Sequence, residues 1–220
     1  MARGDWFRNT SWTPEIEAEF DRRLRRARDK TQYLRIQAVF LAKTHPEKAL
    51  ELVGRYFELG NGFDEAGAHV TRAEAYLAMH DLDKALAAYE AALLREAGPG
   101  GFKTGASLDY PRLIAERNLA TLFSRALNIL EQRRQNLFLP IEFYLWAGAK
   151  AMIFSELGRI AEAQSFAKEA LAAASIRDSG LRYHRDIGLV DATRTPFKST
   201  CRPLWAVTIC EPEVTRASPS

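Results

Sequence analysis

The chain has 220 residues, of which 47% are hydrophobic and 27% charged, and its formal net charge is +3. This composition allows one large domain or a continuous repeat array, whereas no run approaches the ~18 apolar residues of a membrane span. The small excess of positive charge does not by itself indicate a nucleic-acid partner.

Residues 1–30 predict a leader followed by one helix. The leader carries Trp6, Phe7 and Trp12, and its sequence lacks the apolar stretch of a signal peptide, so none is expected. Three large aromatic side chains favour packing onto the rest of the protein. The alternative is an exposed segment that binds a partner. The helix is expected to begin near Pro14, because proline is favoured at the first helical position.

The second half of this helix, DRRLRRARDK, is rich in arginine. One interpretation is a patch that binds phosphates or an acidic partner. The interpretation that we favour is a solvated helix end whose cations complement the helix dipole. The candidate anion or nucleic-acid patch consists of Arg22, Arg23, Arg25, Arg26 and Arg28.

Residues 31–60 and 64–96 each predict a pair of antiparallel helices. Within 71–94, small and apolar residues recur at helical spacing on both sides of Asp81. Asp81 is expected to cap the second helix of this pair, because its carboxylate can accept hydrogen bonds from free backbone N–H groups.

A glycine-rich loop is expected at 97–109. It is not a phosphate-binding Walker loop, since a phenylalanine stands where that motif has glycine before its lysine. Residues 110–135 then predict two helices with a break near 121–124. Residues 139–175 predict a fourth pair of helices, with Gly158 at its turn.

One alanine in the second helix of each pair recurs at near-regular intervals, slightly longer than ~34 residues. These alanines are Ala49, Ala85, Ala126 and Ala163. In the second pair, small and aromatic residues follow a more detailed pattern, made of Ala73, Tyr76, Ala85, Tyr89, Ala92 and Leu93.

This pattern resembles the tetratricopeptide repeat (TPR), with His80 in place of the turn glycine of that family. The resemblance covers 31–175. It implies an all-α fold of about four antiparallel helix hairpins in a TPR-like right-handed stack, preceded by the N-terminal helix.

Residues 176–220 predict an extended tail, because helical periodicity is lost there. The segment 204–210, LWAVTIC, favours a short extended stretch between two prolines. The tail is expected to dock on the helices or to pair with itself, and 213–220 are expected to fray.

The sequence contains no catalytic motif. The four histidines have no metal-ligand spacing, and the spacing of Cys201 and Cys210 is not that of a C-x-x-C motif. We therefore expect no metal, no cofactor and no enzymatic activity. We also expect a cytoplasmic location with reduced thiols. Arginine outnumbers lysine by 23 to 8, which hints at a bacterial gene.

The TPR resemblance implies a mostly apolar groove, lined by the first helices of the hairpins, that binds other proteins. The expected function is therefore a scaffold or adaptor that binds a protein or peptide, or that forms a homo-oligomer. One alternative is a nucleic-acid-associated or regulatory accessory protein that uses the arginine-rich helix. Another is a small-molecule sensor or enzyme with a site between helices and tail. The expected partner-binding residues are Leu41, Glu74, Tyr76, Leu77, Trp146 and Met152.

Overall fold

The computed structural model describes residues 5–60, 64–98 and 102–191, and this part of the chain is all-α, without β-strands. The predicted all-α fold class is therefore confirmed. The chain divides into two compact units, Met1–Ala106 and Ser107–Ser220, here called the N-terminal and C-terminal units. The boundary between them falls inside the predicted glycine-rich loop.

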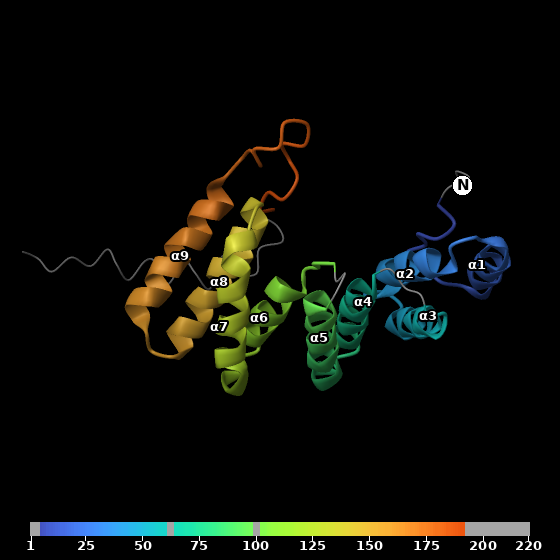
Figure 1. The fold of residues 1–220 in the computed structure, drawn as a ribbon, viewed down its shortest axis with the longest axis horizontal. Helices are drawn as coiled ribbons and strands as arrows, with labels where there is room; N and C mark the ends of the chain where they lie inside the picture. Colours follow the sequence, from blue (N-terminus) through green and yellow to red (C-terminus); the bar gives the residue numbers. More distant parts are fainter. Residues whose placement is uncertain (1–4, 61–63, 99–101, 192–220) are drawn as a thin grey trace, which may run out of the picture. The chain divides into compact units, whose positions relative to one another are not determined.

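The described residues of the N-terminal unit form five helices, which are labelled in Figure 1. Helix α2 packs against α1 and α3, and α4 packs against α3 and α5. The successive helix pairs α2–α3 and α4–α5 correspond to the predicted pairs 31–60 and 64–96. The bounds are α1 Pro14–Arg26, α2 Lys30–Leu41, α3 Pro46–Glu58, α4 Glu65–Ala78 and α5 Leu82–Ala97.

Most of these helices begin at a side chain that satisfies free backbone N–H groups. The hydroxyl of Thr13 accepts a hydrogen bond from the third residue of α1, and proline occupies the first position as predicted. Aspartates cap the next helices in the same way: Asp29 caps α2, Asp64 caps α4, and Asp81 caps α5. The predicted cap at Asp81 is confirmed.

The leader packs onto α1 and α2, as predicted from its aromatic residues. The Trp6 ring lies 4.8 Å from the Tyr33 ring and 5.4 Å from the Phe20 ring, measured between centroids. The side-chain amide of the buried Gln37 accepts a hydrogen bond from the Asn9 N–H at 3.0 Å and donates one to the Asn9 carbonyl at 2.7 Å. The leader thus covers one face of α2.

The C-terminal unit contains four α-helices and two short 3₁₀ turns within its described residues. The long helices α8 and α9 pack against each other and form the predicted pair 139–175. The bounds are α6 Ala106–Glu116, α7 Phe123–Arg133, α8 Pro140–Glu156 and α9 Ile160–Ser175, with 3₁₀ turns at Ala120–Leu122 and Arg134–Asn136.

The region 110–135 forms two helices as predicted, with the break at 117–122. A loop was predicted at 97–109, but helix α6 already begins at Ala106, so the loop is shorter at its C-terminal end than predicted. The hydroxyl of Thr104 accepts a hydrogen bond from the Ala106 N–H at 3.1 Å, which provides a cap that composition did not indicate.

The same turn ends α4, α6 and α8. Each helix is followed by a residue with positive φ: His80 at 60°, Asn118 at 49° and Gly158 at 72°. In each turn the next backbone N–H donates to the carbonyl five residues earlier, a Schellman pattern that satisfies the helix end. These bonds join Asp81 to Tyr76, Leu119 to Ile114 and Arg159 to Phe154, at 2.9, 3.0 and 2.9 Å.

The described part of the tail docks on the start of α8. The Ile141 N–H donates to the Gly188 carbonyl at 2.8 Å, and Val190 is buried. Gly188 has φ +71°, and a Cβ there would lie 2.7 Å from the Leu139 side chain. The extended stretch predicted at 204–210 lies outside the described residues. Of the helices described, none is long and apolar enough to cross a membrane.

Candidate functional site

A hollow of about 470 Å³ lies in the N-terminal unit, between α2, α4 and the loop that follows α5. It is called the α2–α4 hollow below. These two helices are the first members of successive helix pairs. Its lining consists of Arg35, Val39, Asp64, Gly67, Val70, Thr71, Glu74, Phe102, Lys103, Thr104 and Gly105.

The walls of the hollow are mainly apolar, with charges of both signs. Val39 is 41% exposed and Phe102 is 47% exposed, so two large apolar side chains face solvent around it. Two cations and two carboxylates share the lining, and their formal charges cancel. Such a surface suits an apolar group flanked by polar ones.

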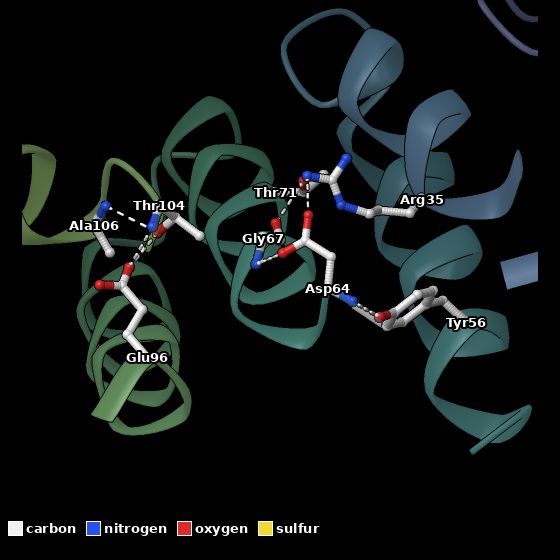
Figure 2. A network of polar contacts seen from close by, with 8 residues as sticks. All are labelled: Arg35, Tyr56, Asp64, Gly67, Thr71, Glu96, Thr104 and Ala106. Atoms are coloured by element: carbon white, nitrogen blue, oxygen red, sulfur yellow. Dashed lines mark hydrogen bonds and ion pairs between the residues drawn. The ribbon is translucent and has the colours of Figure 1, made fainter. Parts of the chain in front are cut away.

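Arg35 of α2 forms an ion pair with Asp64, directly before α4, as Figure 2 shows. The second carboxylate oxygen of Asp64 accepts a hydrogen bond from the Gly67 N–H at 2.9 Å. The Asp64 backbone N–H donates to the Tyr56 hydroxyl at 3.1 Å, and burial raises the pKa of that tyrosine. One residue therefore ties the start of α4 to both α2 and α3.

The ion pair requires glycine at position 67. A Cβ there would lie 2.5 Å from one carboxylate oxygen of Asp64 and 2.6 Å from a guanidinium nitrogen of Arg35. The buried Thr71 hydroxyl donates to the Gly67 carbonyl at 3.0 Å, one turn further along α4. The part of the lining around Asp64 and Gly67 is thus fixed by close contacts.

The opposite rim is anchored to Glu96, a buried carboxylate of α5. The Thr104 N–H donates to this carboxylate at 3.0 Å, and the Thr104 hydroxyl also contacts it (Figure 2). The Lys103 ammonium donates to the Glu96 carbonyl at 3.1 Å. These bonds hold Phe102 at the edge of the hollow, because the residues that follow it are fixed.

Of the six predicted partner-binding residues, Glu74 lines the α2–α4 hollow. Leu41 is completely buried in the core with Phe20, so its side chain cannot contact a partner in this conformation. Tyr76 and Leu77 are partly buried on α4, outside the lining, and the Lys84 ammonium lies 5.5 Å from the Tyr76 ring centroid.

The other two predicted residues belong to α8, in the C-terminal unit. Trp146 is buried, and its indole N–H donates to the Leu130 carbonyl at 2.7 Å. Met152 is partly buried. The structure therefore does not gather the six residues into one site.

The lining residues that the sequence did not predict as site residues include Arg35, Asp64, Phe102 and Lys103. Asp64 caps α4, a role that an aspartate directly before a helical segment favours. The ion pair with Arg35 joins residues far apart in sequence and carries no local pattern.

Two arginines of the arginine-rich end of α1 form ion pairs with one carboxylate, that of Glu19. Glu19 accepts hydrogen bonds from Arg22 at 2.7 Å and from Arg23 at 2.5 Å. The bond from Arg22 and then that from Arg23 lower the pKa of Glu19 to about 2. Arg25, Arg26 and Arg28 are exposed and make no ion pair within the described residues.

The described lining of the α2–α4 hollow has no histidine or cysteine. Within the residues described, no group of three histidine, cysteine, aspartate or glutamate side chains could hold a metal ion. Comparisons with protein-family models, curated proteins and solved structures found no match. The chemistry of the hollow is therefore the basis for assigning a function.

Proposed function

We propose that this protein is a non-enzymatic scaffold or adaptor that binds a protein or peptide partner through the α2–α4 hollow. The observation that carries the proposal is the combination in this hollow of exposed Val39 and Phe102 with charges of both signs. Its volume of about 470 Å³ falls within the range of ligand pockets, ~300–1,000 Å³. A short extended peptide with an apolar side chain fits this chemistry.

The contacts that Asp64 makes in the lining of the hollow also favour binding. The Asp64 contacts to Arg35, Gly67 and Tyr56 hold α2, α3 and α4 together without a ligand. A preformed site loses less conformational entropy when a partner binds, so more of the contact energy remains as affinity.

We further propose that the helix pairs form a TPR-like stack. The repeated Schellman turns after α4, α6 and α8 support equivalent hairpins. A second copy of the chain is an alternative partner. A cytoplasmic location and a bacterial source remain predictions from composition. The nucleic-acid alternative has less support, because Glu19 already pairs with Arg22 and Arg23.

The test is selection of peptides from a random displayed library against the purified protein, followed by affinity measurement by calorimetry. Val39→Arg places a large cation at the hollow and should weaken the binding of a selected peptide by about tenfold or more, since interface cores exclude unpaired charge. The matched control is Leu94→Arg, at a 74% exposed leucine of α5 outside the lining. If no peptide is enriched, or if both variants bind equally well, the proposal is wrong.

A further inference from the structure

A second hollow, of about 340 Å³, lies where the end of α1 meets the start of α2 and the end of α3. It is called the basic hollow below. Its apolar surface comes from one leucine at each of three places: Leu24 of α1, Leu34 of α2 and Leu59 just after α3. The first two are buried, and Leu59 is 45% exposed. Leu59 therefore provides the exposed apolar contact of the basic hollow, next to the buried Leu24 and Leu34.

The charges around the basic hollow are mainly positive once internal pairs are removed. Arg55 and Asp21 neutralise each other at 2.8 Å. Arg25 and Lys30 are exposed lining residues that make no ion pair within the part of the chain that the structure describes. Glu58 is the remaining carboxylate of the lining.

Two further exposed cations lie close in sequence to the hollow: Arg26 is the last residue of α1, and Arg28 lies in the turn between α1 and α2. The nearby Asp29 carboxylate is engaged as the cap of α2: it accepts hydrogen bonds from the Gln32 N–H at 3.1 Å and from the Thr31 hydroxyl at 2.9 Å. This turn therefore presents an excess of positive charge beside an apolar surface.

We infer that the basic hollow binds an acidic peptide segment that packs one leucine-sized side chain against Leu59, with its carboxylates against Arg25 and Lys30. Charge complementarity selects the acidic peptide and fixes its orientation. The apolar surface favours a peptide over single-stranded nucleic acid, since single strands bind through aromatic stacking platforms and the described lining residues include no aromatic one. The inference does not depend on the α2–α4 hollow.

The test is fluorescence anisotropy of the full chain with three labelled probes. The first is a short glutamate-rich peptide with one central leucine, the second has glutamine in place of that leucine, and the third is a DNA duplex. The leucine peptide is expected to bind most tightly. The double variant Arg25→Glu/Lys30→Glu should weaken binding of the leucine peptide by about tenfold, since each charge reversal replaces an attraction by a repulsion.

The matched control is Arg117→Glu/Lys168→Glu, which makes the same charge change at exposed positions of the C-terminal unit. It should leave the affinity for the leucine peptide within about twofold of wild type. In a further variant, Leu59→Gln, the leucine and glutamine peptides should bind equally, because the apolar contact is removed. Circular dichroism verifies that each variant is folded.

The inference is overturned if wild type does not distinguish the two peptides, or if the reversal and control variants weaken binding equally. Tighter binding of the DNA duplex that is lost in Arg25→Glu/Lys30→Glu would assign the surface to nucleic acid instead. Loss of leucine-peptide binding in Val39→Arg would move the peptide to the α2–α4 hollow and likewise overturn the inference.

Discussion

Gly54 and Gly67 provide a matched pair of helix substitutions with opposite expected effects. Both lie within helices, and alanine normally stabilises such positions by about 0.5–1 kcal/mol relative to glycine. A Cβ on Gly54 would meet nothing within 4 Å, so Gly54→Ala should give this full gain. A Cβ on Gly67 would instead lie 2.5 Å from the Asp64 carboxylate.

In Gly67→Ala, the Asp64 and Arg35 side chains can rotate away, so the cost is the loss of their contacts. Loss of the helix cap costs about 1 kcal/mol, and loss of a partly exposed ion pair costs up to about 1 kcal/mol. The gain from helix propensity offsets part of this. We expect a net destabilisation of about 1 kcal/mol, which separates the two variants by about 2 kcal/mol.

Urea denaturation followed by circular dichroism measures this difference. With an m-value of about 2 kcal/mol/M, Gly67→Ala should lower the unfolding midpoint by about 0.5 M, and Gly54→Ala should raise it. A double-mutant cycle then isolates the cause. In an Asp64→Ala background the carboxylate is absent, so Gly67→Ala should be neutral or stabilising. The reasoning is refuted if Gly67→Ala stabilises the wild-type protein as much as Gly54→Ala does.

Two further predictions concern the turn after α4 and the end of α1. His80 has φ 60°, so His80→Gly removes left-handed strain and should stabilise the protein by about 1 kcal/mol in the same urea assay; an unchanged midpoint would contradict this. The Glu19 pKa of about 2 lies below the ordinary glutamate value of 4.5, so its ion pairs stabilise the fold above pH 4.5 and this contribution is lost as pH falls towards 2. An NMR titration should show the Glu19 pKa rising in Arg22→Gln, and an unchanged value would exclude that hydrogen bond.

Local patterns predicted several helix starts and turns well, because capping and turn formation depend on residues close in sequence. Asp81 and Pro14 marked helix starts correctly, and Gly158 marked a turn. His80 was identified as the residue at the turn-glycine position, and its positive φ shows that histidine can adopt the conformation there. Asn118 adopts the same conformation, although sequence reasoning did not identify it.

The groove prediction depended on which helix face stays open, and periodicity does not contain that information. Leu41 lies on an apolar face of α2, but Phe20 of α1 and the leader aromatics pack against the same core. Of the hollow, the sequence predicted Glu74 but not the Arg35–Asp64 pair or Phe102. The ion pair joins residues far apart in sequence, and Phe102 lies in a glycine-rich loop, which composition alone describes as irregular.

The bond pattern between Asn9 and Gln37 also sets an order of events during protein synthesis. The main chain of Asn9 obtains both of its hydrogen bonds from a side chain 28 residues later. The leader therefore cannot reach its final place until α2 has left the ribosome. Until then, Trp6 and Phe7 lack the ring contacts that Tyr33 of α2 provides in the folded chain.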